Sequence, residues 1–223
     1  MNTEKHIVIV AGGKGLRLGA EIPKQFVEIN GLPILMHTIN VFRKSGVEDI
    51  VLVLPESHFD FWENLCQKHH FQSPKFVAGG KERFHSVRNG INALANQNGI
   101  VGIHDAVRPF VNSNTINQGF EEALNHGSAI PFAPVRDTLR QNQNNQFQLV
   151  NRNDFILIQT PQFFNLQSFA KIINETDFNE QITDDASVYE GDGNSCFFYE
   201  GNHENIKITF ASDLLIAKAL LGN

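Results

Sequence analysis

Residues 6–25 read "HIVIVAGGKGLRLGAEIPKQ", an apolar run followed at once by a glycine-rich stretch that carries cations. The apolar run predicts a buried strand. Glycines placed directly after a strand let backbone N–H groups approach a phosphate, and Arg17 and Lys24 would add positive charges there. The spacing from Gly13 to Gly19 is one residue too long for the dinucleotide fingerprint, and the stretch lacks the ending of a Walker loop. It therefore predicts a loop for a nucleoside triphosphate, with a solvated glycine turn as the alternative.

Apolar strands alternate with helical patterns over the first 135 residues. Strand–helix–strand alternation requires crossover connections, so we expect an α/β fold with a Rossmann-like, mainly parallel open sheet flanked by helices. Ligands bind at the carboxyl ends of the strands in such sheets, which is where the glycine-rich stretch begins. The expected strands cover residues 6–11, 49–55, 76–79, 101–104 and 129–135, and the expected helices cover 33–44, 59–69, 86–96 and 115–126.

The rhythm changes in "RDTLRQNQNNQFQLVNR" (136–152), where two weakly apolar segments flank a tip rich in Gln and Asn. This pattern predicts a projecting β-hairpin with its turn at 141–146, and we favour an arm that grips a second subunit over a solvated flap. We expect one nucleotidyltransferase domain over 1–223, with the β-arm inserted at about 136–156. Further expected elements lie at 169–174 and 184–190, followed by strands at 196–200 and 206–209 and a last helix at 214–221 capped by Ser212.

Composition narrows the class of protein. The chain has 223 residues, a formal charge of -6 and 41% hydrophobic residues, as expected of a single globular domain. An acidic balance argues against nucleic-acid binding. We expect a cytoplasmic protein without a membrane segment, because no apolar run approaches the roughly 20 residues of a membrane helix and the start has no signal-peptide pattern. Cys66 and Cys196 are expected to be reduced thiols.

Two further strand ends carry polar or charged residues. "HDAVRPF" (104–110) follows the fourth expected strand, and the carboxylate of Asp105 there suits a hard cation such as Mg²⁺. "GGKERFHSV" (79–87) follows the third, where Gly79 and Gly80 would let the backbone approach a base or ribose and Ser86 could hydrogen-bond it. Arg83 could be a solvated helix residue. Together, three strand ends with glycines, cations or a carboxylate predict a phosphate-ligand site.

These motifs, taken in order, resemble the 2-C-methyl-D-erythritol 4-phosphate cytidylyltransferases. The resemblance covers nearly the whole chain and rests on "AGGKGLRLG", "PKQ", "GGKERFHSV", "HDAVRP", "APVRDT", "NRN", "TPQ", "TDDAS" and "NIKIT". It implies that the phosphate of methylerythritol 4-phosphate attacks the α-phosphorus of CTP and that pyrophosphate leaves, with Mg²⁺ or another divalent cation on the triphosphate. Such a reaction needs cations in place before charge grows on the phosphoryl group, and few proton-transfer groups.

The resemblance also implies roles for individual residues. Arg17, Lys24 and Lys207 match the catalytic positions. Asp105 matches a position that touches the nucleotide, the metal and the acceptor. Arg152, on the expected hairpin, would reach the neighbouring subunit's site in a homodimer, and Thr160 matches a position that lines the site. The remaining CTP-binding positions are Ala11, Gly12, Gly13, Gly15, Gly80, Lys81 and Ser86. The remaining acceptor positions are Arg108, Thr138 and Thr183.

Three alternatives differ in what they require. Ribitol-5-phosphate cytidylyltransferases share "HDAVRPF", but "APVRDT" and "TDDAS" match the methylerythritol enzymes, which makes Thr138 and Thr183 the discriminating residues. A nicotinamide oxidoreductase would need the dinucleotide fingerprint that is absent here. An inactive binding protein would be expected to lack some of the matched cations and acids. One departure from the family pattern is Lys81, which stands where we expect an acid in the base-recognition turn.

Overall fold

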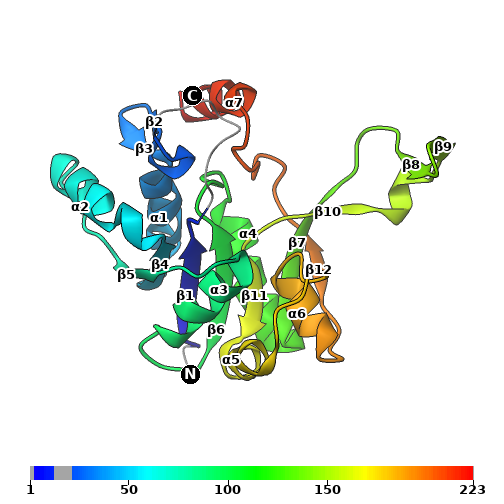
Figure 1. Cartoon of the computed structure of the whole chain (residues 1–223), viewed down its shortest axis with the longest axis horizontal. Helices are drawn as coiled ribbons and strands as arrows, with labels where there is room; N and C mark the ends of the chain where they lie inside the picture. Colours follow the sequence, from blue (N-terminus) through cyan, green and yellow to red (C-terminus); the bar gives the residue numbers. More distant parts are fainter. Residues whose placement is uncertain (1–2, 13–21, 223) are drawn as a thin grey trace.

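The computed structural model describes residues 3–12 and 22–222 and has the α/β architecture that the alternation predicts (Figure 1). Its main sheet contains eight strands in the order β10-β7-β11-β6-β1-β4-β5, with β12 also paired to β7. The strands are β1 (Lys5–Val10), β4 (Asp49–Leu54), β5 (Lys75–Ala78), β6 (Ile100–Asp105), β7 (Ser128–Pro134), β10 (Ile156–Ile158), β11 (Gln162–Asn165) and β12 (Phe198–Glu200).

Most of the sheet is parallel. β1 pairs in parallel with β4 and β6, and β4 pairs in parallel with β5. Two strands depart from this arrangement: β11 runs antiparallel between β6 and β7, and β10 runs antiparallel to β7. The carboxyl ends of β1, β4, β5 and β6 therefore meet along one edge of the sheet, which brings together the motifs that follow them.

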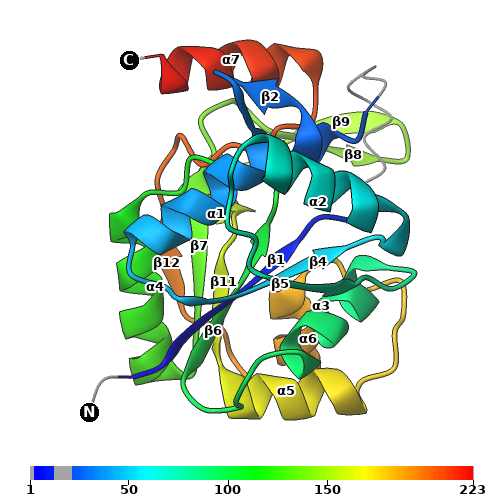
Figure 2. The ribbon, with the colours of Figure 1, turned by 90° about the vertical axis from the view of Figure 1, so that its left-hand side faces the viewer.

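Helices cover both faces of this sheet (Figure 2). The helices are α1 (Ile34–Lys44), α2 (Phe59–Lys68), α3 (Arg83–Asn92), α4 (Ser113–His126), α5 (Leu166–Glu175), α6 (Asp185–Gly191) and α7 (Ala211–Leu221). Short 3-10 turns cover Lys24–Phe26, Glu56–His58 and Arg152–Asp154, and β2 (Glu28–Ile29) pairs with β3 (Leu32–Pro33) in a separate ribbon.

The apolar run in β1 is continuous because both of its faces are buried. Successive strand residues point to opposite faces of a sheet. Ile7 and Ile9 belong to a core cluster with residues of α1, α2 and α4, whereas Val8 and Val10 belong to a second cluster with residues of α3, α5 and α6. A strand covered on both sides carries an uninterrupted apolar pattern, which makes the run a sound predictor of a central parallel strand.

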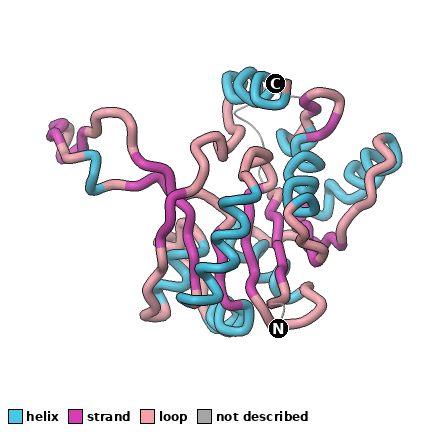
Figure 3. Tube along the Cα trace, turned by 180° about the vertical axis from the view of Figure 1, so that it is seen from behind, coloured by secondary structure: helices cyan, strands magenta, loops and turns pink. Residues whose placement is uncertain are grey.

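The segment after β7 contains a hairpin made of β8 (Arg140–Gln143) and β9 (Gln146–Leu149). Its turn is shorter than the expected 141–146, because only Asn144 and Asn145 lie between the strands, both with positive φ (52° and 65°) as a two-residue hairpin turn requires. Figures 1 and 3 show this hairpin extending away from the main sheet. Phe147 and Leu149 are 65% and 66% exposed. Its use as a dimer arm stays a prediction.

Two expectations near the C-terminus are wrong. Residues 206–209 form no strand, because the backbone of Ile208 makes isolated contacts, donating to the Val107 carbonyl at 3.0 Å, rather than a ladder with a neighbouring strand. Ser212 is not the cap of the last helix but lies inside its first turn. The carboxylate of Asp213 accepts from the backbone N–H groups of Thr209 and Phe210 instead, at 2.7 and 2.8 Å.

Candidate active site

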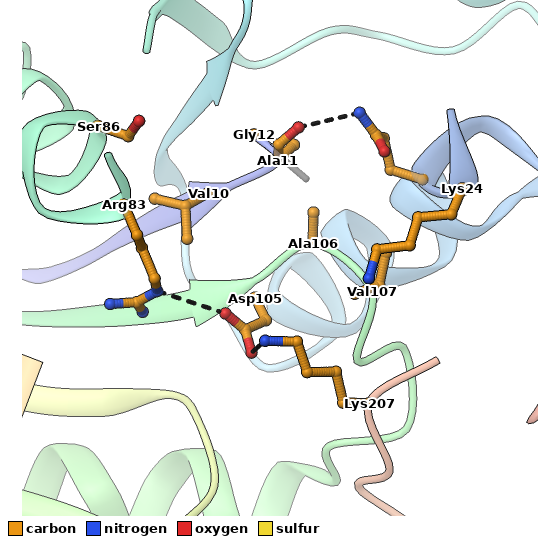
Figure 4. A pocket seen from close by; sticks show the side chains of 11 residues that line it. Val10, Ala11, Gly12, Lys24, Arg83, Ser86, Asp105, Ala106, Val107 and Lys207 are labelled. Carbon is orange, nitrogen blue, oxygen red and sulfur yellow. Dashed lines mark hydrogen bonds and ion pairs between the residues drawn. The ribbon is translucent and has the colours of Figure 1, made fainter. Parts of the chain in front are cut away.

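A pocket of about 260 Å³ opens at the carboxyl ends of β1 and β6 (Figure 4). Its lining comes from the end of β1 and the residues after it, from the 3-10 turn that begins at Lys24, from α3, from the end of β6 and the turn that follows, and from Lys207. Its lining residues are Val10, Ala11, Gly12, Lys24, Gln25, Arg83, Ser86, Asp105, Ala106, Val107 and Lys207. The pocket thus joins segments from five separate parts of the sequence.

Asp105 lies at the centre of the charged groups in this pocket. Its Oδ2 atom is 3.0 Å from Lys207 Nζ and 3.2 Å from Arg108 Nε, and its Oδ1 atom is 3.6 Å from Arg83 Nε. Burial would raise the pKa of this carboxyl, but the charges of Arg83, Lys207 and Arg108 outweigh burial and hold the pKa well below its usual range. Asp105 is therefore ionised at neutral pH and surrounded by cations.

Asp105 is also held from behind by a chain of hydrogen bonds. Its backbone N–H donates to Thr160 Oγ1 at 3.1 Å, and the Thr160 hydroxyl donates to His104 Nδ1 at 3.0 Å. The other ring nitrogen of His104 is 3.0 Å from the Arg108 carbonyl, which can only accept, so Nε2 carries the proton. Burial lowers the pKa of His104 to about 4, which keeps the ring neutral. The resemblance predicted that Thr160 lines the site, but Thr160 is not among the lining residues of the pocket. It is buried and positions Asp105 instead.

The two ends of the glycine-rich stretch are tied together. Gln25 is buried, and its side-chain amide donates to the Ala11 carbonyl at 2.9 Å. Lys24 precedes it in a 3-10 turn that follows Pro23, and Lys24 Nζ donates to the Ile208 carbonyl at 3.3 Å. Gln25 therefore holds Lys24 beside the end of β1. Gly13, Gly15 and Arg17 lie outside the described residues.

This contact makes Gln25 a positioning residue for the pocket. We expect Gln25→Leu to lower the free energy of unfolding by about 1–3 kcal/mol, because the buried Ala11 carbonyl loses its donor. We also expect CTP to bind about tenfold more weakly, since the segments on either side of the pocket lose their connection. Urea denaturation and titration calorimetry measure the two effects. Gln118→Leu, on the exposed surface of α4, is the control, and CTP affinity unchanged by Gln25→Leu would contradict this role.

The turn before α3 is close-packed. A side chain at Gly80 would come within 2.3 Å of His85 Cβ, so this position requires glycine. The Gly80 N–H donates to Ser86 Oγ at 3.1 Å, and Ser86 is buried and lines the pocket. Gly80 and Lys81 are exposed and are not among the lining residues. Of the expected CTP-binding residues Gly80, Lys81 and Ser86, the structure brings Ser86 to the pocket.

The expected acceptor residues, together with the expected catalytic residue Lys207, lie in three places. Arg108 and Lys207 contact Asp105, as described above. Thr138 and Arg152 instead line a separate hollow of about 370 Å³ at the base of the β8–β9 hairpin, where Arg152 donates to the Arg136 carbonyl. Thr183 is exposed, next to the first turn of α6, and is not a lining residue of the pocket. A single chain therefore does not bring all of the expected acceptor residues together.

Sequence reasoning missed two residues that the structure places at or behind the pocket. The guanidinium of Arg83, which the pattern left as a solvated helix residue, faces both Asp105 and the buried carboxylate of Asp185. The sequence pattern gave no role to Gln25, which follows Lys24. Arg83 and Gln25 both lie in motifs of the resemblance, but no local pattern indicates that their side chains point into the protein.

The residues present fit a metal ion that enters with its ligand. No group of three or more His, Cys, Asp or Glu side chains suited to a metal occurs within 3–12 and 22–222. Asp105 could supply one oxygen, and a hard divalent cation requires several more, which triphosphate oxygens would provide.

Among the helices within residues 3–12 and 22–222, none combines the length and the apolar character that a membrane-spanning helix needs.

The fold and pocket together define a class of protein: an α/β protein with a cation-lined, phosphate-type site at the carboxyl edge of its parallel strands. Residues 5–223 match the family model for 2-C-methyl-D-erythritol 4-phosphate cytidylyltransferase, and the chain belongs to that family.

Individual relatives agree with this assignment. The chain is 46% identical to the 2-C-methyl-D-erythritol 4-phosphate cytidylyltransferase of Bacteroides thetaiotaomicron over 98% of this chain and 100% of that protein. It is 48% identical to the protein of the same name from Bacteroides fragilis, over 96% and 98%. The crystal structure of the Francisella tularensis enzyme of this name has a TM-score of 0.79 at 28% identity, covering 97% of this chain and 99% of that one.

Proposed function

We propose that this protein transfers the cytidylyl group of CTP to 2-C-methyl-D-erythritol 4-phosphate, giving CDP-methylerythritol and pyrophosphate in non-mevalonate isoprenoid biosynthesis. An acceptor phosphate oxygen forms a bond to the α-phosphorus of CTP, and the bond from that phosphorus to the pyrophosphate oxygen breaks. The observation that carries the proposal is the cluster of Asp105, Lys207, Arg83 and Lys24 in one pocket at the strand ends.

Electrostatics supports this chemistry. Two polyanions must approach each other, and negative charge grows on the leaving pyrophosphate, so cations fixed beforehand stabilise the transition state. In our proposal Lys24 and Arg17 stabilise the α-phosphate and the leaving group, and Lys207 holds the acceptor phosphate for attack. The ion pair between Lys207 and Asp105 at 3.0 Å keeps the lysine directed into the pocket.

The nucleotide occupies the side of the pocket nearer β1 and α3 in this proposal. Backbone N–H groups of the glycine-rich stretch cradle the phosphates, and Ser86 contacts the base, with Asp105 beside the ribose. The proposed CTP-binding residues are Ala11, Gly12, Gly13, Gly15, Gly80, Lys81, Ser86 and Asp105. A divalent cation such as Mg²⁺, held by Asp105 and the triphosphate, would neutralise part of the phosphate charge.

The acceptor side requires a second subunit. We propose that the chain is one domain whose insertion at about 136–156 is the arm of a homodimer. Support comes from the distribution of the acceptor residues: Asp105 lines the pocket and Arg108 contacts it, whereas Thr138 and Arg152 lie together on the hairpin segment. Placed over a partner's pocket, Arg152 would add a bidentate donor for the acceptor phosphate, with Thr183 completing the site. We propose a cytoplasmic location, since CTP is supplied there.

Pyrophosphate release tests the function. The purified protein is incubated with CTP and Mg²⁺, and methylerythritol 4-phosphate is compared with ribitol 5-phosphate. We expect release with the former, in agreement with the names of the relatives. Release with ribitol 5-phosphate alone would keep the CTP site and overturn the acceptor. CTP binding without release from either would indicate another acceptor or an inactive protein.

A further inference from the structure

Arg83 and Asp185 form a buried ion pair that joins α3 to α6. Arg83 Nη1 and Nη2 each lie 2.8 Å from one carboxylate oxygen of Asp185, so the pair is bidentate. The Asp185 side chain is 2% exposed. Burial alone would lower the pKa of Arg83, but Asp185 and then Asp105 raise it, so the guanidinium stays charged. Bidentate arginine–carboxylate pairs fix orientation as well as charge.

The pairing of Arg83 with Asp185 determines which nitrogen of Arg83 faces Asp105. With both terminal nitrogens of Arg83 on Asp185, the remaining Nε faces Asp105 Oδ1 at 3.6 Å, beyond normal hydrogen-bond distance (Figure 4). The other oxygen, Oδ2, contacts Arg108 and Lys207 at 3.2 and 3.0 Å. Oδ1 is thus the oxygen of Asp105 that accepts no hydrogen bond from the described residues.

Asp185 is itself anchored to the strand that supports Asp105. Gln162, at the start of β11, donates to Asp184 Oδ2 and accepts from the Ala186 N–H, both at 2.9 Å. Asp184 caps α6 by accepting from the Ser187 N–H at 2.9 Å. Thr160, two residues before Gln162, accepts the Asp105 N–H. Both carboxylates are therefore positioned by the same short stretch of chain.

We infer that Asp185 is a positioning residue that keeps Oδ1 of Asp105 available to a ligand by holding the Arg83 fork away from it. This inference deepens the proposed function and rests on it. The available oxygen is suited to a ligand hydroxyl or to a cation that enters with the triphosphate. When Asp185 is replaced by a neutral residue, Arg83 loses its bidentate partner, and the carboxylate that it still faces is Asp105. The arginine then turns onto Oδ1 and occupies it.

The test uses the sign of the change in binding. Asp185→Asn removes a negative charge near a site for polyanions, so Coulomb attraction alone would tighten CTP and the acceptor. Our inference gives the opposite result: the KM for methylerythritol 4-phosphate rises about tenfold and CTP binds more weakly in calorimetry. Adding Arg83→Gln removes the competing arginine, so Asp185→Asn should no longer weaken binding when it is compared with Arg83→Gln alone. Asp192→Asn, an exposed acid directly after α6, is the matched control and leaves both values unchanged.

Each outcome bears on the inference. Unchanged or tighter binding in Asp185→Asn overturns it, as does a loss of binding from Asp185→Asn that is as large in the Arg83→Gln protein as in the wild type. A purely structural role predicts a lower Tm without a change in KM measured well below Tm. If Asp185→Asn does not fold, Asp185→Ser, which also removes the charge, gives the same comparison with and without Arg83→Gln. Wild-type turnover is measured in parallel; if it is absent, the proposed function fails, and CTP calorimetry still decides the role of Asp185.

Discussion

Lys24→Ala is expected to lower kcat by about 10²-fold or more, the scale on which loss of one preorganised transition-state donor acts. Lys24 lines the pocket, and its position is set by Pro23 before it, by the buried Gln25 after it and by its contact with the Ile208 carbonyl. A cation held in this way stabilises the growing charge on the leaving pyrophosphate without having to reorganise. The effect should therefore fall on kcat more than on the affinity for CTP.

Single-turnover and steady-state pyrophosphate release separate chemistry from binding in this variant. Lys24→Arg keeps the charge with a different geometry and should recover part of the loss. Lys171→Ala, on the exposed face of α5, removes a lysine far from the pocket and serves as the control. Turnover at the wild-type rate in a folded Lys24→Ala protein would remove Lys24 from the catalytic group.

Arg152→Ala is expected to raise the KM for methylerythritol 4-phosphate by about 10²-fold while CTP affinity persists, because it removes a bidentate charge contact to the acceptor phosphate, a loss of roughly 3 kcal/mol. In one chain Arg152 lies in the hollow at the base of the hairpin, separate from the pocket that contains Asp105. The expected loss therefore depends on the arm of a second subunit reaching this pocket. Steady-state kinetics with each substrate varied in turn measures the change.

Mixed dimers distinguish action across the subunit boundary from action within one chain. A Lys24→Ala subunit retains an intact arm, and an Arg152→Ala subunit retains an intact pocket. Random pairing makes about half of the dimers mixed, each with one complete site, so activity should recover to about a quarter of wild type. No recovery, despite mixed dimers shown by differential tagging, would mean that each chain completes its own site.

Much of the site could be predicted because its residues follow strands. The end of β1, the turn before α3 and the end of β6 each carry a short motif, and parallel strands place those motifs at one edge. Asp105 and Ser86 could be assigned to the pocket on this ground alone. The partner of Arg83 could not, because Asp185 lies 102 residues away and the contact depends on how α6 packs against the sheet.

Strand β11 shows the same limit in the fold. Nothing in "TPQ" and the residues after it indicates that this segment enters the sheet antiparallel between β6 and β7, and the sequence pattern left it unassigned. Residues 206–209 show the reverse error. Their pattern is typical of a strand, but they form no strand ladder in the structure, and the backbone N–H of Ile208 donates instead to the Val107 carbonyl.

The sequence by itself determined the properties that arise from neighbouring residues: the buried strands, the crossover helices, and the presence of glycines and cations directly after the first strand. Local sterics and hydrophobic periodicity act over a few residues, so they can be recognised in a single chain. Only the tertiary structure decided which distant residues meet, namely Arg83 with Asp185, Thr160 with the backbone of Asp105 and Gln25 with the backbone of Ala11. It also separated Arg152 from the pocket. Those outcomes depend on packing between elements, and the energy of a contact between distant residues leaves no local pattern in the sequence.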